Sequence, residues 1–241
     1  MTLVVYPLLI AWTFFGLLVS PLFFLVWRLV TGLPAGRIAR QLIWIYGRSW
    51  MAIVAPFVRF RRAGLDQPGI RPPAIFVVNH LSFFDTFCMA LLPFSDITFA
   101  VRSWPFRMFW YAGFMRLAGY LDVETMNWEE CLIAGRRVME RDGFLLFFPE
   151  GHRSRSGELQ RFYSGAFRLA REFGVPVIPL CLVGTDRLLP PGRRWLRPAR
   201  VELRALPPVD PAPFADHGEL RRHVKALMAG ELKAMRQERP A

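Results

Sequence analysis

A histidine followed five residues later by an aspartate is the first feature of this chain that points to chemistry. The pair is His80 and Asp85. An imidazole titrates near neutral pH, so His80 is our candidate general base. Asp85 would accept a hydrogen bond from one ring nitrogen and leave the other to take a proton from a hydroxyl. Because this spacing turns about 140° on a helix, the two meet only if His80 lies where a loop enters a helix and folds back over its first turn. We expect Asn79 to cap that helix.

A second motif, residues 148–154, places an acid, a tight turn and a fixed cation after an apolar strand. Ligands of α/β proteins bind at the carboxyl ends of buried strands, so this position favours a binding role. The guanidinium of Arg153 suits an anionic head group because its fork holds two phosphate oxygens. Glu150 would bind a substrate hydroxyl or hold the turn at Gly151; alternatively, Glu150 and Arg153 pair only with each other. Together the two motifs predict a site that deprotonates a hydroxyl beside a bound anion.

The three cysteines offer neither a metal site nor a disulfide framework. Cys88, Cys131 and Cys181 are far apart in apolar surroundings, with no CxxC or Cys/His spacing. We expect them to be buried and reduced in a protein that faces the cytosol. Cys88 is near His80 in sequence, but its apolar surroundings would raise the pKa of the thiol and suppress a nucleophilic thiolate.

The N-terminal residues place this chemistry at a membrane. Residues 1–27 carry no charge, and the run is longer than the ~20 residues that span a bilayer core. It lacks the basic start and the cleavage pattern of a signal peptide. Pro7 and Pro21 interrupt it, so a kinked or re-entrant helix and a straight span are both open. A buried helical hairpin of a soluble domain is the alternative.

The charge pattern agrees with a membrane-attached protein. The net charge is +12 although 53% of the residues are hydrophobic and the mean hydropathy is +0.25. This combination favours an anionic membrane surface over nucleic acid, for which no helix-turn-helix, zinc-finger or RNP pattern is present. Residues 38–58 mix arginines with tryptophan and tyrosine, as suits the lipid head-group level. The arginines that follow the first segment place the remainder in the cytoplasm.

Strands and helices alternate beyond residue 56, which predicts an α/β fold with a mostly parallel central sheet flanked by helices. We therefore divide the chain into a hydrophobic helical membrane anchor, residues 1–56, and an α/β domain, residues 57–241. The expected strands are 57–62, 74–78, 97–102, 144–148, 175–180 and 201–206, and the expected helices are 82–92, 129–141, 164–173 and 219–236. The last helix is basic and would either dock an acidic carrier protein or anionic lipid, or present a solvated face.

Four segments in order resemble the glycerolipid (lysophospholipid) acyltransferase family. They are Asn79-His80-x4-Asp85, Phe148–Ser154, Phe162–Phe167 and Val175–Pro179. The resemblance covers roughly residues 57–210 and implies a glycerol-3-phosphate acyltransferase-like domain. The apolar N-terminus also resembles the two-helix membrane anchor of the bacterial 1-acylglycerol-3-phosphate acyltransferases, which implies a bacterial inner membrane with the catalytic domain on its cytoplasmic face.

The resemblance implies a reaction without a metal or other cofactor. An acyl group would pass from acyl carrier protein or CoA to the hydroxyl of a lysolipid, with 1-acylglycerol-3-phosphate giving phosphatidic acid as the leading case. His80 would act as the base, held by Asp85, with no acyl-enzyme. The expected partners are membrane lipids, the lysolipid and the acyl thioester, and not nucleic acid. The residues expected to bind substrate are Glu150, Gly151, Arg153, Ser154 and Arg102.

The second motif of the family, Gly-x-x-Phe-Ile-x-Arg, is altered in this chain. The matching residues 119–125 carry Asp122 at the aromatic position and Thr125 at the arginine position. The loss of a cation weakens a phosphate site, and we expect Arg102 to compensate. The altered motif suits an alternative acceptor, a lysolipid with a different head such as a lyso-ornithine lipid. Two further alternatives do not depend on this motif: a thioesterase in which His80 activates water, and a lipid-binding protein without activity.

Overall fold

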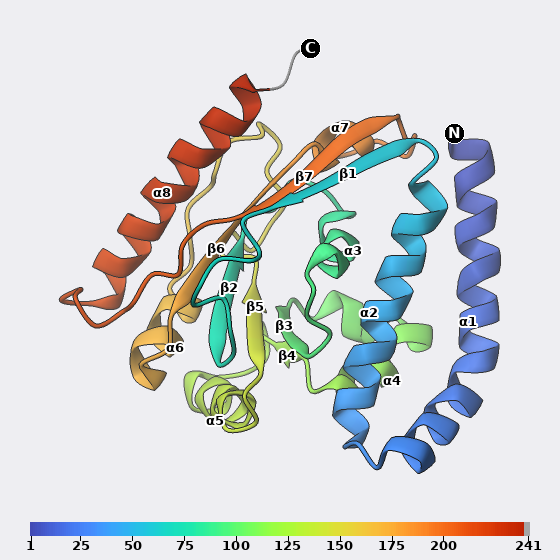
Figure 1. Ribbon diagram of the computed structural model, residues 1–241, viewed down its shortest axis with the longest axis horizontal. Coiled ribbons are helices and arrows are strands. Elements are labelled where there is room, and N and C mark those ends of the chain that lie inside the picture. Colours follow the sequence, from blue (N-terminus) through green and yellow to red (C-terminus); the bar gives the residue numbers. More distant parts are fainter. Residues whose placement is uncertain (239–241) are drawn as a thin grey trace.

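The computed structural model describes residues 1–238 and contains one seven-stranded sheet between two layers of helices (Figure 1). The sheet order is β1-β7-β6-β2-β5-β3-β4. The strands are β1 (Val58–Ala63), β2 (Ala74–Val78), β3 (Ile97–Val101), β4 (Leu121–Asp122), β5 (Phe144–Phe147), β6 (Val177–Val183) and β7 (Ala199–Ala205). Of these strand pairs only β6–β7 is antiparallel, which confirms the predicted mostly parallel sheet. Residues 239–241, the end of the predicted domain 57–241, lie outside the described residues.

Helices cover both faces of the sheet (Figure 1). One side carries α5, α6 and α8, and the other carries α1 to α4. The helices are α1 (Thr2–Thr31), α2 (Ala35–Val54), α3 (Asp85–Cys88), α4 (Phe109–Ala118), α5 (Trp128–Met139), α6 (Gly165–Phe173), α7 (Thr185–Leu188) and α8 (His217–Gln237), with the 3-10 turns η1 (Met89–Leu91) and η2 (Trp104–Arg107).

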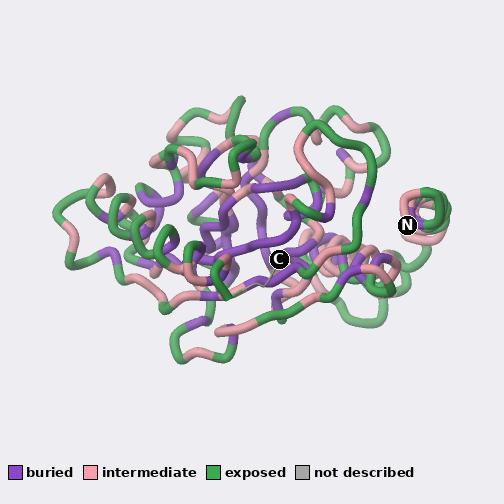
Figure 2. Tube along the Cα trace, turned by 90° about the horizontal axis from the view of Figure 1, so that it is seen from above, coloured by how far each residue is buried: buried purple, intermediate pink, exposed green. Residues whose placement is uncertain are grey.

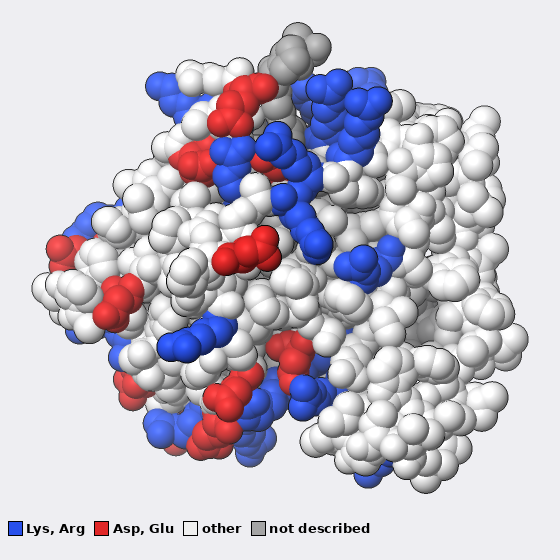
Figure 3. All heavy atoms as spheres, viewed as in Figure 1, with Lys and Arg blue, Asp and Glu red and all other residues white. Residues whose placement is uncertain are grey.

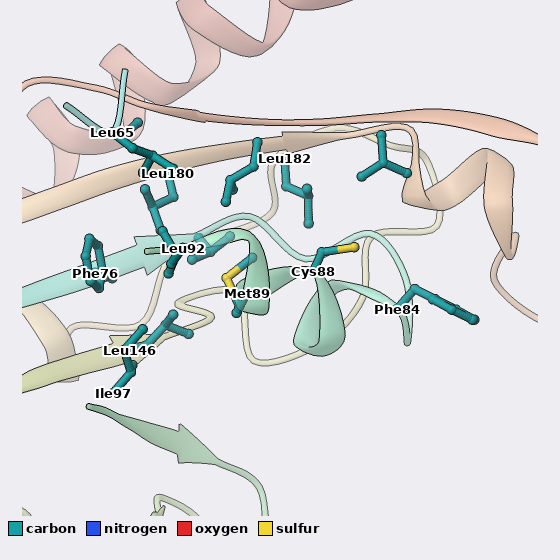
Figure 4. Close-up of a cluster of buried hydrophobic side chains, with 14 of the residues drawn as sticks. Leu65, Phe76, Phe84, Cys88, Met89, Leu92, Ile97, Leu146, Leu180 and Leu182 are labelled. Carbon is teal, nitrogen blue, oxygen red and sulfur yellow. The ribbon is translucent and has the colours of Figure 1, made fainter. Parts of the chain in front are cut away.

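The central strands are buried on both faces, so each contributes to two cores. Along β2, Phe76 belongs to the core under α2 and α3, whereas Ile75 and Val77 belong to the core under α6 and α8. This alternation follows from the period of two in a strand. Figure 2 shows the buried trace through the middle of the molecule, and Figure 4 shows the first core. A sheet covered by helices on both faces therefore carries the loops at its carboxyl edge.

The expected elements are present with two kinds of difference. The predicted helix 82–92 is reduced to α3 and η1, because the residues before Asp85 form a loop that bonds to the Asp85 side chain. The helix α4 was not predicted, since its composition is apolar around most of its circumference and gives little periodic contrast.

The N-terminal segment is one continuous helix packed beside α2. Pro7 and Pro21 lie inside α1 without ending it. By length and composition α1 is the one helix within residues 1–238 apolar enough to cross a membrane, and only 6% of its most apolar stretch is buried. This exposure contradicts the alternative of a buried hairpin, because the apolar side chains of α1 face outward.

Candidate active site

His80 and Asp85 meet because His80 lies in the loop that enters the helix α3, the position that their spacing requires. The Nδ1 atom of His80 lies 2.8 Å from Oδ2 of Asp85, the first residue of α3. The same oxygen accepts the backbone N–H groups of Leu81 at 2.5 Å and Ser82 at 2.8 Å. Asp85 therefore fixes both the imidazole and the loop that carries it. With Nδ1 turned to Asp85, Nε2 is the nitrogen left to accept a proton.

Burial differs sharply between the two members of the pair. The Asp85 side chain is fully buried, whereas that of His80 is 18% exposed. The imidazole also packs against the ring of Phe148, with 4.5 Å between the ring centroids. A buried carboxylate behind a partly exposed imidazole leaves one face of the histidine open to a substrate.

The second motif holds the backbone of His80. Oε1 of Glu150 accepts the N–H of His80 at 2.8 Å, and Oε2 accepts the N–H of Gln160 at 2.9 Å. The N–H of Ser154 donates to the His80 carbonyl at 2.7 Å. Burial raises the pKa of the Glu150 carboxyl, against the two backbone hydrogen bonds and the nearby His80, which lower it. The two motifs are therefore one structural unit.

A glycine is required at the turn after Glu150. Gly151 has a φ of 70°, and a Cβ there would lie 2.8 Å from the ring of Tyr163. A larger side chain would be strained by this backbone conformation and would have to displace the Tyr163 ring. Gly151 thus brings Glu150 and Ser154 back toward His80.

The predicted substrate-binding residues of this motif have different surroundings. Glu150 and Ser154 are each 2% exposed, and the Ser154 hydroxyl donates to the Glu158 carbonyl at 2.7 Å. Of the two roles considered for Glu150, the contacts show it holding the turn, and its contact with a substrate stays a prediction. Arg153 is exposed and forms no hydrogen bond or ion pair within residues 1–238. The alternative in which Glu150 and Arg153 pair only with each other is therefore wrong.

The expected role of Asn79 as a helix cap is also wrong. Its amide donates to the Leu182 carbonyl at 2.8 Å and accepts the Leu182 N–H at 2.7 Å. The strand β6 continues past the end of β2, so its backbone groups need partners there, and the Asn79 side chain supplies both. Asn79 joins the loop of His80 to the neighbouring strand.

Arg102, which follows β3, lies at the same edge but is engaged by an acid. Its Nε donates to Glu124 Oε1 at 2.5 Å. The Ser103 N–H and the Arg102 guanidinium, in that order, lower the pKa of Glu124. The Ser103 hydroxyl donates to Asp122 at 2.7 Å. The altered second motif therefore supplies a carboxylate to Arg102, from Glu124, and one to Ser103, from Asp122. Sequence reasoning missed both contacts, although both acids are in the motif.

The cysteines lie away from this chemistry or are deeply buried. Cys88 and Cys181 are buried, and burial raises the pKa of both thiols, that of Cys181 to about 12. Cys131 is only partly buried, which corrects the expectation that all three are buried. A thiolate nucleophile at Cys88 is disfavoured by this environment.

Known proteins resemble this chain both in sequence and in fold. The family model described as Acyltransferase matches residues 58–183. A chloroplast 1-acyl-sn-glycerol-3-phosphate acyltransferase of Brassica napus is 30% identical over 177 residues, 70% of this chain and 51% of the relative. An enzyme of the same name from Salmonella typhimurium is 30% identical over 175 residues, 68% of this chain and 69% of the relative. This chain thus spans about half the length of the plant relative.

A solved structure shares the whole fold. The crystal structure of the 1-acyl-sn-glycerophosphate (LPA) acyltransferase PlsC from Thermotoga maritima matches with a TM-score of 0.79 over 100% of both chains, at 22% sequence identity. The match includes the N-terminal helices as well as the sheet.

Proposed function

The chain belongs to the acyltransferase family, and on that basis we propose that it is a membrane-bound O-acyltransferase that acylates the hydroxyl of a lysolipid. The acceptor proposed first is 1-acylglycerol-3-phosphate, which would give phosphatidic acid, because both relatives are named 1-acyl-sn-glycerol-3-phosphate acyltransferases. The donor is an acyl thioester of acyl carrier protein or CoA, a substrate rather than a resident cofactor. The observation that carries the proposal is the His80–Asp85 pair, with Nε2 of His80 unpaired within residues 1–238.

The proposed chemistry follows from that geometry. Nε2 of His80 takes the proton of the acceptor hydroxyl as its oxygen attacks the thioester carbonyl. The negative charge of Asp85 stabilises the imidazolium that forms and keeps the ring oriented. When the tetrahedral intermediate collapses, the C–S bond breaks and the imidazolium returns its proton to the departing thiolate. The acyl group then forms an ester with the acceptor, and no acyl-enzyme is needed.

The N-terminal residues supply the proposed location. Residues 1–56 would act as the membrane anchor, and residues 57–241 as the acyltransferase domain. The outward apolar face of α1 supports membrane attachment. The arginines after α1 favour a cytoplasmic position of the domain, on the inner membrane of a bacterium.

A lysolipid without a phosphate head, such as a lyso-ornithine lipid, is a second candidate acceptor. The contact between Arg102 and Glu124 favours it, because the cation expected to compensate for Thr125 is already paired with a carboxylate. With Asp122 and Glu124 beside the single cation Arg102, this motif carries a net negative charge, which disfavours a phosphate more than a head with an ammonium group.

Release of free thiol by the purified protein in neutral detergent micelles tests both candidates. Acyl-CoA and acyl carrier protein thioesters are supplied with lysophosphatidate, with lyso-ornithine lipid, or with no acceptor, and the lipid product is identified by mass spectrometry. Transfer to an acceptor is expected, whereas release without an acceptor would indicate a thioesterase, and binding without turnover would indicate a lipid-binding protein.

A matched pair of histidine variants tests the mechanism. His80→Ala removes the base and should lower the rate by about a hundredfold to ten-thousandfold. His152→Ala, in the neighbouring motif and exposed, should change it little. Activity that survives His80→Ala would overturn the proposed mechanism.

A further inference from the structure

The connection between α7 and β7 is a loop of arginines and a tryptophan. Residues 187–200 contain five arginines and neither aspartate nor glutamate: Arg187, Arg193, Arg194, Arg197 and Arg200. All five are exposed, and none forms an ion pair within residues 1–238. Trp195, in their midst, is 63% exposed. We call residues 190–198 the basic loop; it contains Arg193, Arg194 and Arg197 and is flanked by Arg187 and Arg200. This concentration of unpaired positive charge favours an anionic partner.

The basic loop is fastened to the first turn of α1. The Thr2 hydroxyl donates to the Leu196 carbonyl at 3.2 Å and accepts the Leu196 N–H at 2.9 Å. The Tyr6 hydroxyl donates to the Arg194 carbonyl at 2.8 Å. Figure 1 shows the N-terminus beside the α7–β7 connection at one end of the molecule. The loop therefore has a fixed place relative to the apolar helix.

The face of α1 that continues from the loop is apolar. Leu3, Leu18 and Leu29 are 81%, 80% and 76% exposed, and Figure 3 shows the α1 side of the molecule almost without charged residues. An apolar face bordered by arginines and a tryptophan is the composition of a protein surface at the boundary between acyl chains and head groups.

The other end of the loop reaches the catalytic edge. The Ser82 hydroxyl donates to the Leu189 carbonyl at 2.9 Å, directly before the loop. The Arg197 N–H donates to the Leu188 carbonyl at 3.0 Å, which closes the loop on itself. Ser82 lies two residues after His80, so a surface that holds the loop also holds the catalytic histidine near it.

We propose that the basic loop docks on anionic lipid head groups and so positions the His80 edge at the membrane surface. The proposal rests on the proposed membrane-bound function. An acidic protein would match the charge equally well, but the lipid surface is favoured because the loop is continuous with the exposed apolar face of α1. The arginines would bind head-group phosphates, and Trp195 would lie at their level.

Flotation of the full-length protein with vesicles tests this docking. Each Arg near an anionic surface contributes about fivefold in binding (~1 kcal/mol). The variant R193Q/R194Q/R197Q should therefore lose about a hundredfold in binding to vesicles of phosphatidylcholine with phosphatidylglycerol, and little on phosphatidylcholine alone. The matched control R71Q/R136Q/R137Q removes the same charge at exposed positions outside both the basic loop and α8 and should lose far less.

The outcomes separate the docking from the proposed reaction. Equal loss in the two triple variants, or none in either, would overturn the docking. The same holds if the loop variant keeps its vesicle binding and instead loses capture of purified acyl carrier protein. Acyl transfer in neutral micelles should be equal in the wild type and both variants. If no protein transfers acyl groups while the vesicle difference persists, the reaction fails and the docking stands.

Discussion

Replacing Asp85 by Asn should separate the charge of the site from its shape. Oδ2 of Asp85 accepts three hydrogen bonds, from the His80 ring and from two backbone N–H groups, whereas Oδ1 is buried without a partner. An asparagine can therefore keep its oxygen at the three-donor position and place its amide nitrogen where Oδ1 was. No further donor or acceptor is left unpaired, and the weaker bonds to a neutral oxygen are offset by the removal of a buried charge. We therefore expect the free energy of unfolding to change by no more than about 1 kcal/mol.

Glu150→Gln gives the matched contrast. Each Glu150 oxygen accepts one backbone N–H, so the amide nitrogen of a glutamine must face a donor in either orientation. Losing a hydrogen bond to a charged group and leaving an N–H unpaired should cost about 2–4 kcal/mol, or roughly 5–15 °C in Tm for a chain of this size. The same isosteric change is thus predicted to alter the free energy of unfolding little at Asp85 and strongly at Glu150.

For each folded molecule we expect Asp85→Asn to lose more activity than Glu150→Gln, which is the reverse of their order in loss of stability. The neutral amide of the Asp85→Asn variant no longer stabilises the imidazolium, so this substitution should lower kcat by about a hundredfold to ten-thousandfold. Thiol release measured beside thermal unfolding on the same preparations tests both quantities, with Asp186→Asn as the control acid next to the site. If Asp85→Asn unfolds as early as Glu150→Gln, or keeps its kcat within tenfold, the proposed division of roles is refuted.

Three further predictions concern acids and thiols. Burial raises the pKa of Glu150, so the folded protein retains a proton that the unfolded chain releases above about pH 4.3. The stability of the wild type relative to Glu150→Gln should therefore fall as the pH rises from about 4.3 through the higher pKa of the folded state. Urea unfolding at stepped pH measures this. Cys88 and Cys181 should resist alkylation in the native protein, since burial raises both pKa values, and Cys88→Ala should keep transferase activity within a few fold; a loss like that of His80→Ala would contradict this. Glu124→Gln frees Arg102 and should lower KM for a phosphate-headed acceptor by about threefold to tenfold. An unchanged KM would show that Glu124 does not compete with the phosphate for Arg102 at this exposed pair.

Local sequence was enough to predict the elements that carry the site. The runs that became β2 and β5 are apolar at every residue, as is typical of strands in a sheet covered on both faces. The meeting of His80 with Asp85 was also predictable, because both lie within one short loop and one helical turn. These features depend only on residues that are close together in the sequence, which is the range that periodicity and spacing describe.

The contacts that define the roles of the other residues join distant parts of the chain. Glu150 meets the backbone of His80, 70 residues away, and Asn79 meets Leu182, 103 residues away. A side chain's type does not reveal whether its hydrogen-bonding atoms are used by the protein or left for a substrate. For that reason the sequence left two roles open for Glu150, binding a substrate or holding the turn, and only the structure shows that each of its oxygens accepts a backbone N–H.

The sequence by itself determined that a candidate histidine base, with an aspartate placed to orient it, follows a buried strand in a chain with an apolar helix at its start. Only the tertiary structure decided what surrounds that base: a carboxylate that holds its backbone, an arginine paired with Glu124, and a basic loop fastened to Thr2. The physical reason is that the sheet brings the carboxyl ends of several strands to one edge, and the groups that meet there are chosen by packing rather than by their order along the chain.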